Sequence, residues 1–322
     1  MWPPLPEIPR YEYAGQLTGW ENFPDASAED RQRAEKAVRW LVGLDEESEF
    51  GDQEDKLGLR RPQTGVTDEQ GRIYVTDVGQ HAVVVFDKPE GTLKIWNKAT
   101  GSTPFSVPVG IALGPDGQIL VADAELGRVI RLDRNGNPVG ELGRDSLQRP
   151  TGLARDPVKK LIYVSDTRAH DIKVFNDAGE LLEIIGAPGM KTGTFNSPTH
   201  IAFHNRQLYV ADTLNARVQI FSEDGDFVNS FGNLGIKVGN MVRPKGVTAD
   251  SEGNIYVIES LHDHLLIYNP QGQFLLPIGG TGQEIGQFFL PSGVWTDGHG
   301  RIYIADMFNG RVIILNFLGG SE

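Results

Sequence analysis

The sequence predicts an all-β fold in which one structural unit is repeated six times around an axis. Each unit opens with a proline that is soon followed by a glycine, except where a histidine replaces the glycine in the fourth unit, and successive prolines lie 42 to 48 residues apart. Each unit also contains short runs rich in Val, Ile, Tyr and Phe that are bounded by turn residues, which is typical of strands. Four short antiparallel strands in about 45 residues form one blade of a β-propeller. The fold class is therefore a six-bladed β-propeller with four-stranded blades. The opening prolines are Pro62, Pro108, Pro150, Pro198, Pro244 and Pro291.

The second and third runs of the six units align in register. The second run reads RIYVTD, QILVAD, LIYVSD, QLYVAD, NIYVIE and RIYIAD along the chain, and it ends on a carboxylate every time. The third run begins five residues after that carboxylate. A turn then leads into a fourth run in the first five units, so each of those units supplies the four strands of a blade.

These units resemble the NHL repeat family. The segment 211–232, ADTLNARVQIFSEDGDFVNSFG, is similar to the core motif of that family, and the resemblance covers residues 61–317. It implies the six-bladed propeller. The family includes lyases, RNA-binding modules and protein-docking domains, so the resemblance implies no single function.

The sixth unit ends after its third strand, since the run RVIILNF leads directly into the final residues of the chain. Residues 10–18 resemble the missing fourth strand, with glycines placed as in the other fourth strands. Because propellers avoid an unpaired edge by joining their two chain ends, residues 10–18 are predicted to complete the sixth blade. Residues 1–322 then form a single propeller domain.

Residues 20–60 are the one segment outside the repeats. Good helix formers over 26–42, a cap at Ser27 and a stop at Gly43 predict a short helix packed on the side or rim of the propeller. A helix that binds a partner is the alternative. Residues 45–56 carry seven acidic residues and one lysine, which indicates a solvated loop. A cation-binding loop is the alternative there, although the spacing does not match the calcium-hand pattern.

Composition excludes several functional classes. The net charge of −13, from 30 basic and 43 acidic residues, argues against nucleic-acid binding, since phosphate neutralisation dominates that affinity. The chain has no cysteine, which removes disulfides, thiolate metal sites, cysteine nucleophiles and haem attachment motifs. No apolar stretch approaches the roughly 18 residues of a membrane span, so no transmembrane segment is predicted.

The functional site is expected at one mouth of the central channel. The loop before each first strand and the turn between each second and third strand open on the same face, and binding residues concentrate on such loops. The fifth unit breaks the Asp-x-x-Asn-x-Arg pattern of that turn, and the fourth unit has a histidine where the others have glycine. The predicted ligand- or partner-binding residues are His200, Lys245, Glu259, His262, His264, Arg168 and His170.

Histidines from two neighbouring blades suggest a metal site. His262 and His264 have the spacing of a chelating pair, and His200 is the candidate third ligand for zinc. The alternatives are a solvated polar turn for the pair and a hydrogen-bonded core position for His200. The six carboxylates that end the second strands form no metal ring in this interpretation, because a residue repeated in every blade is expected to cap the turn of every blade.

Three functional classes compete. A non-enzymatic scaffold that docks a protein partner is favoured, with no catalytic residue and no cofactor, because similar blades offer a broad rigid face. The alternative is a zinc-dependent lyase similar to the peptide-amidating NHL enzymes, with Tyr256 or Arg168 as an acid or clamp. A calcium-dependent lactonase is disfavoured because the positions before the glycines offer no carboxylate or amide ligand set.

The leader MWPPLPEIPRYEYAG resembles the mature amino terminus of exported bacterial NHL lipoproteins. This resemblance implies a periplasmic or outer-membrane-anchored protein, with Met1 standing where an export signal and a lipidated cysteine have been removed. A cytoplasmic relative is the alternative. The implied partner is a protein of a cell-envelope assembly.

Overall fold

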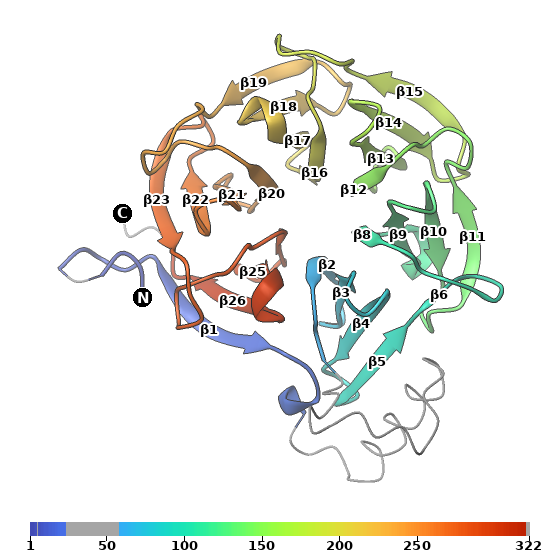
Figure 1. Ribbon diagram of the computed structural model, residues 1–322, viewed down its shortest axis with the longest axis horizontal. Helices are drawn as coiled ribbons and strands as arrows, with labels where there is room; N and C mark the ends of the chain where they lie inside the picture. Colours follow the sequence, from blue (N-terminus) through green and yellow to red (C-terminus); the bar gives the residue numbers. More distant parts are fainter. Residues whose placement is uncertain (5, 24–57, 320–322) are drawn as a thin grey trace.

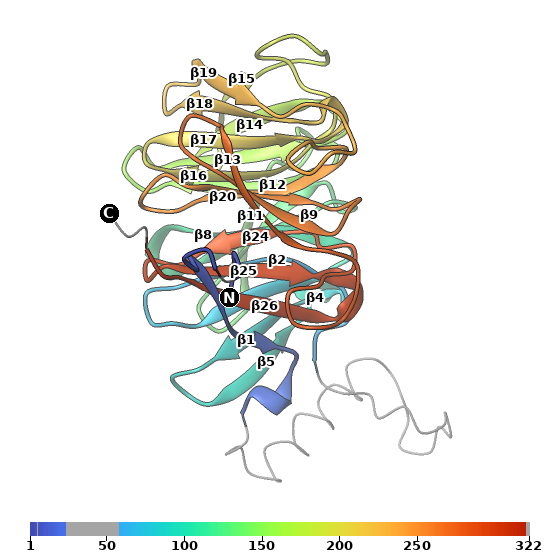
Figure 2. The same ribbon diagram turned by 90° about the vertical axis from the view of Figure 1, so that its left-hand side faces the viewer.

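Six four-stranded antiparallel sheets surround a central axis in the computed structural model (Figure 1). The structure describes residues 1–4, 6–23 and 58–319. Seen from the side, the sheets form a disc with loops and turns on its two faces (Figure 2). The predicted fold class, an all-β six-bladed propeller, is therefore confirmed.

The blades are numbered in chain order, and each begins with its innermost strand. Blades 1 to 3 contain β2 (Pro62–Thr67), β3 (Ile73–Asp77), β4 (Ala82–Asp87), β5 (Thr92–Trp96); β8 (Pro108–Leu113), β9 (Ile119–Asp123), β10 (Arg128–Leu132), β11 (Pro138–Leu142); and β12 (Pro150–Asp156), β13 (Leu161–Asp166), β14 (Asp171–Asn176), β15 (Leu181–Ile185). Blades 4 and 5 contain β16 (Pro198–His204), β17 (Gln207–Asp212), β18 (Arg217–Ser222), β19 (Phe227–Phe231); and β20 (Pro244–Ala249), β21 (Ile255–Glu259), β22 (His264–Tyr268), β23 (Phe274–Gly279).

Blade 6 takes its strands from both ends of the chain. It contains β24 (Val294–Thr296), β25 (Arg301–Asp306), β26 (Arg311–Phe317) and β1 (Tyr11–Leu17). A small hairpin of β6 (Lys98–Thr100) and β7 (Thr103–Pro104) lies outside the blades. Four 3-10 turns complete the described elements, and they are η1 (Trp20–Asn22), η2 (Pro115–Gly117), η3 (Thr213–Asn215) and η4 (Met307–Asn309).

The core lies between neighbouring blades. One cluster joins Val75 and Phe86 of blade 1 to Trp295 and Tyr303 of blade 6, and all four side chains are buried. Equivalent clusters fill the other spaces between blades. Because each sheet is covered on both faces, its middle strands are almost continuously apolar, which explains the unbroken Val, Ile and Tyr runs in the sequence.

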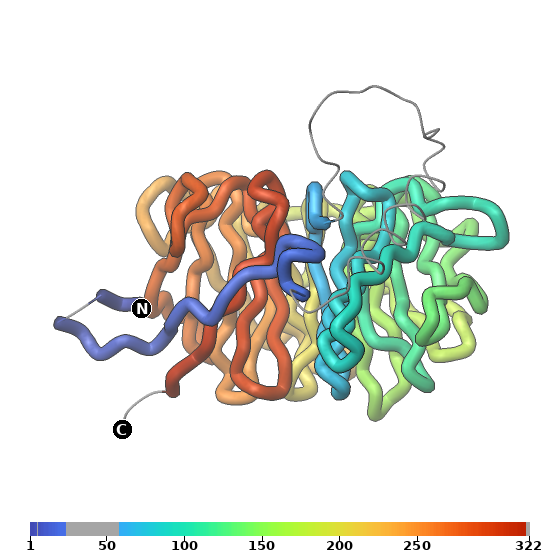
Figure 3. Tube along the Cα trace, turned by 90° about the horizontal axis from the view of Figure 1, so that it is seen from below, coloured from blue at the N-terminus to red at the C-terminus, as the bar shows by residue number. Residues whose placement is uncertain are grey.

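Strand β1 closes the ring by pairing with β26, as residues 10–18 were predicted to do. Tyr11 lies opposite Phe317 and Leu17 lies opposite Val312. Tyr11 and Leu17 are both 3% exposed, so the closing strand contributes to the core as well as to the hydrogen-bond ladder. Figure 3 shows this N-terminal segment running beside the C-terminal strands.

The predicted helix over 26–42 and the acidic loop over 45–56 lie outside the described residues. Within the described ranges no segment is an α-helix. Residues 1–4, 6–23 and 58–319 therefore contain no helix with the length and apolar character needed to cross a membrane.

Candidate functional site

The carboxylate at the end of each second strand caps the backbone around it. The carboxylate of Asp77 accepts hydrogen bonds from the N–H groups of Arg60 and Arg61 at 2.7 and 3.0 Å, and from those of Gly79 and Gln80 at 2.8 and 3.0 Å. The predicted capping role is confirmed, because the equivalent carboxylates also accept from backbone N–H groups. These equivalents are Asp123, Asp166, Asp212, Glu259 and Asp306.

These contacts place two sets of segments together on one face. The loop before each first strand is here termed the lead-in loop, and the turn between the second and third strands is termed the second turn. Since each carboxylate bonds both segments of its blade, the lead-in loops and second turns surround the same end of the channel. This face is termed the channel-mouth face.

Hydroxyl groups join neighbouring blades around the channel. The Oγ1 atoms of Thr151 and Thr199 donate to the backbone oxygens of Thr199 and Lys245, at 2.8 and 3.0 Å. The Oγ of Ser292 donates to the backbone oxygen of Gln63 at 2.8 Å, which links blade 6 to blade 1. These residues, which precede Gly152, His200 and Gly293, therefore join neighbouring blades, and their differing side chains gave no sign of this shared role in the sequence.

His200 bridges the channel. Blades 1 and 4 face each other across the axis in Figure 1, and the Nε2 atom of His200 lies 3.0 Å from the Oγ1 of Thr64 in blade 1. Its Nδ1 atom lies 3.0 Å from the backbone oxygen of Val247 in blade 5. Burial lowers the pKa of His200 to about 4, so the ring is neutral at neutral pH. Both ring nitrogens thus have partners within the propeller, as in the hydrogen-bonded alternative.

The other predicted residues occupy different parts of the channel-mouth face. Lys245 is half-buried beside the axis, and burial, with a further contribution from Arg243, lowers the pKa of its ammonium group. Arg168 is exposed on the second turn of blade 3. The Nδ1 of His170 accepts a hydrogen bond from the N–H of Ser197 at 2.9 Å, so it anchors the lead-in loop of blade 4.

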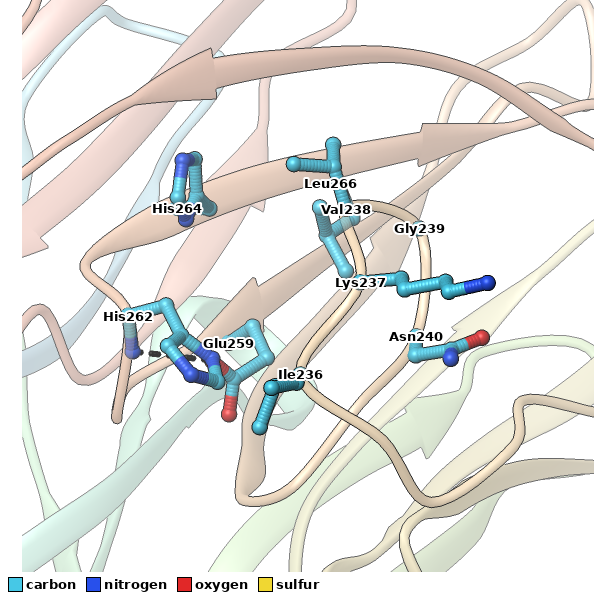
Figure 4. A pocket seen from close by; sticks show the side chains of 9 residues that line it. All are labelled: Ile236, Lys237, Val238, Gly239, Asn240, Glu259, His262, His264 and Leu266. Carbon is cyan, nitrogen blue, oxygen red and sulfur yellow. Dashed lines mark hydrogen bonds and ion pairs between the residues drawn. The ribbon is translucent and has the colours of Figure 1, made fainter.

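Glu259, His262 and His264 lie together in blade 5. The ring of His262 contacts the carboxylate of Glu259, with 2.7 Å between Nδ1 and Oε2, and His264 is the register partner of Glu259 (Figure 4). Burial raises the pKa of Glu259, but hydrogen bonds from Arg243 and His262 outweigh it, so the pKa lies below its ordinary value. For His264, by contrast, burial disfavours the charged ring and is the main reason that the pKa is lowered.

A pocket adjoins these three residues. Its cavity volume is about 60 Å³ and it is partly open to solvent, so it is smaller than the usual small-molecule pocket. Its walls come from the lead-in loop of blade 5, from strands β21 and β22 and from the turn between these strands (Figure 4). The lining residues are Ile236, Lys237, Val238, Gly239, Asn240, Glu259, His262, His264 and Leu266.

The three histidines predicted as zinc ligands do not form one site. His262 and His264 share the pocket of blade 5, whereas His200 uses both nitrogens across the channel. Among residues 1–4, 6–23 and 58–319, no group of three or more His, Asp or Glu side chains is arranged to hold a metal ion. The sequence spacing of His262 and His264 is that of a chelating pair, but His200 points to Thr64 in the opposite blade, and no local sequence pattern reveals that contact.

Exposed apolar side chains on blades 4, 5 and 6 were missed in the sequence. The residue two positions after the capping carboxylate is Leu214, Leu261 or Phe308 in these blades, with exposed fractions of 58%, 48% and 48%. Blades 1 to 3 have Gly79, Glu125 and Arg168 at that position. An alignment of the six second turns shows this difference between blades 1 to 3 and blades 4 to 6 at a single position, two residues after the carboxylate.

These observations define a class of protein, namely six-bladed β-propellers with a capped second turn in every blade. Over 94 residues the chain is 35% identical to the human NHL-repeat-containing protein 4, a match that covers 29% of this chain and 72% of the human protein. The chain therefore belongs to the NHL-repeat family. No protein-family profile matches it.

Solved structures share the fold at low sequence identity. A catalytically inactive virginiamycin B lyase from Staphylococcus aureus, solved with quinupristin, has a TM-score of 0.60 and 17% identity, with 80% of each chain covered. A gluconolactonase from Xanthomonas campestris has a TM-score of 0.61 and 16% identity, with 80% of this chain and 86% of that chain covered. An auxiliary nutrient binding protein from Bacteroides ovatus has a TM-score of 0.61 and 15% identity, with coverage of 81% and 70%. Lyases, lactonases and binding proteins thus share this fold, and the likeness shows the fold alone.

Proposed function

We propose that this protein is a non-enzymatic docking propeller that binds a protein partner through the channel-mouth face of blades 4, 5 and 6. The supporting observation is the set of exposed apolar side chains on that part of the face. The second turns contribute Leu214, Leu261 and Phe308, and a lead-in loop adds Ile236, which is 84% exposed. Several large apolar side chains exposed on one face are typical of a protein-binding site.

The lead-in loops of blades 4, 5 and 6 extend this surface. They comprise residues 187–197, 233–243 and 280–290, and each has the same pattern of backbone bridges. In each loop one side chain is completely buried as an anchor, and these anchors are Phe195, Met241 and Phe288. The anchored loops hold their exposed residues on a rigid base, which lowers the entropic cost of binding. These exposed residues are Met190, Leu234, Ile236, Val238, Ile285 and Phe289.

Photocrosslinking in cells of the source organism tests the docking surface. A photoreactive amino acid at position 236 or 308 should yield one crosslinked protein, and Leu261→Asp in the same chain should remove it. The matched control places the same probe at position 158, because Val158 is 87% exposed but lies in the turn between β12 and β13, on the opposite face. Equal crosslinking from position 158, or none from positions 236 and 308, would contradict the proposal.

The proposed location is the bacterial cell envelope, and the proposed partner is a protein of an assembly there. The support is the resemblance of the leader to exported NHL lipoproteins. Fractionation of cells that express the full gene tests the location, since recovery of the protein in the cytoplasm would contradict it. Crosslinking from position 236 in intact cells tests the partner at the same time.

A further inference from the structure

The arginine of the second turn fills one and the same space in blades 4 and 6. In blade 4 the Nε of Arg217 donates to Asp212 at 2.8 Å, and its Nη2 donates to the backbone oxygens of Lys191 and Thr194, both at 2.8 Å. In blade 6 the Nε of Arg311 donates to Asp306 at 2.8 Å. Its Nη2 contacts the backbone oxygens of Glu284 and Gln287 at 3.5 and 3.0 Å. The guanidinium therefore joins the capping carboxylate to the lead-in loop in both blades.

The asparagine of the second turn makes a parallel contact. The Nδ2 of Asn215 donates to the backbone oxygen of Gly189 at 2.8 Å, and that of Asn309 donates to the backbone oxygen of Gly282 at 2.8 Å. Both amides also donate to the capping carboxylate of their blade. The lead-in loops of blades 4 and 6 thus present three carbonyl groups to side-chain N–H donors.

Blade 5 has the same loop and the same carbonyl groups but lacks these donors. His262 and His264 occupy the asparagine and arginine positions, and among the described residues the ring of His262 has Glu259 as its one hydrogen-bond partner. The three carbonyl groups of this loop belong to Gly235, Lys237 and Asn240 by alignment of the three loops. Across the described ranges, no side-chain donor bonds to any of them. The lining of this pocket includes Lys237, Asn240 and Glu259, which align with the residues that the Arg217 guanidinium contacts in blade 4.

We propose that the blade 5 pocket binds a guanidinium group, and that the docked protein supplies it as an arginine side chain. This inference rests on the proposed docking function. The arginine would take, from a second molecule, the place that Arg217 and Arg311 take within their own blades. A carboxylate and convergent carbonyl oxygens are acceptors that match the five N–H donors of a guanidinium.

The remaining walls of the pocket suit the aliphatic stem of an arginine. Ile236, Val238 and Leu266 are apolar, and long basic side chains bury their methylene groups against such surfaces. The ammonium of Lys237 points away from the two histidines in Figure 4. Lys191 holds the same position in blade 4, where Arg217 binds the backbone oxygen of that lysine, so a lysine there is compatible with a guanidinium.

Binding of L-argininamide to the full chain tests this pocket. NMR should show saturable shifts at His264 and Ile236, and lysinamide should bind at least several-fold more weakly because an ammonium cannot span the same acceptors. The double variant His262→Asn/His264→Arg supplies the missing donors within the chain, and it should lose at least 10-fold in affinity for L-argininamide. The matched variant Arg311→Ala opens the same space in blade 6 and should gain a second site.

Two outcomes would overturn the inference. One is the absence of saturable binding to the unaltered protein, and the other is equal affinity in the double variant. If L-argininamide fails to bind while position 236 still crosslinks to one protein, the docking function stands and the arginine inference falls. If L-argininamide binds but position 236 captures no protein, the pocket stands as a guanidinium site and the docking proposal falls.

Discussion

Blades 5 and 6 have the same framework and differ in two respects. Both contain four antiparallel strands and an equivalent lead-in loop. Blade 5 takes its outer strand from the same repeat, whereas blade 6 takes it from the far end of the chain. Blade 6 also ties its lead-in loop to the second turn through Asn309 and Arg311, whereas blade 5 has two histidines and a pocket there.

This comparison separates two tasks of the repeated motif. Where the motif is complete, the capping carboxylate, the asparagine and the arginine are all used to hold the loop. Where it is incomplete, the carboxylate still caps the backbone, because Glu259 accepts from the N–H groups of Arg243 and His262. The cap is therefore kept in every blade, whereas the asparagine and arginine donors are not.

The largest expected effect comes from removing the outer strand of blade 6. Deletion of residues 1–19 removes β1, which exposes the edge of β26 and the core around Tyr11 and Leu17. Loss of several kcal/mol is expected, which lowers the melting temperature of a chain of this size by roughly 10 °C or more. Deletion of residues 1–9 is the control, since it leaves β1 in place and should cost less. If the chain without residues 1–19 has the same melting temperature as the intact protein, β1 does not close the ring.

The next effect is a difference between the two second turns. Arg311→Ala in blade 6 leaves the buried carboxylate of Asp306 without its cation and two carbonyl groups of the lead-in loop without their donor, which should cost about 3 kcal/mol. His264→Ala in blade 5 should cost less than about 1 kcal/mol, because the described part of the chain offers its half-buried ring no hydrogen-bond partner. Urea unfolding at pH 7.5 measures both. Equal losses would mean that the arginine contributes only packing.

The repeats determined most of what could be predicted from the sequence. Strand positions follow from apolar runs of fixed spacing, and the capping role of Asp77 and its equivalents follows from their presence in every blade. The contact of His200 with Thr64 could not be predicted, because the two residues meet only after six blades have closed. The pocket of blade 5 also escaped prediction, since it depends on which carbonyl groups Arg217 and Arg311 contact in the other blades.

Acid pH should destabilise the whole propeller, and with it blades 5 and 6 alike, because protonation of His200 disturbs contacts that join the blades. Its pKa in the folded protein is about 4 and the ordinary value is about 6.5, so the unfolded chain binds more protons between these values. Stability should therefore fall by up to about 3 kcal/mol as the pH falls from 6.5 to 4. His200→Gln keeps a donor and an acceptor but does not titrate, so it should flatten this dependence. Equal slopes for the two proteins in urea unfolding would contradict the assignment.

The smallest expected effect is a gain, and it tests whether blade 5 gives up stability for its pocket. His262→Asn/His264→Arg restores the donors found in blade 6, and new hydrogen bonds from a charged group should add about 1 kcal/mol. Adding Glu259→Asp reproduces the complete blade 6 motif. The longer side chain of Glu259 reaches the ring of His262, so an aspartate should suit the new asparagine and arginine better and raise the gain in stability further. A loss in both variants would mean that the lead-in loop of blade 5 differs from that of blade 6 in more than its partners, and the equivalence of the two blades would fail.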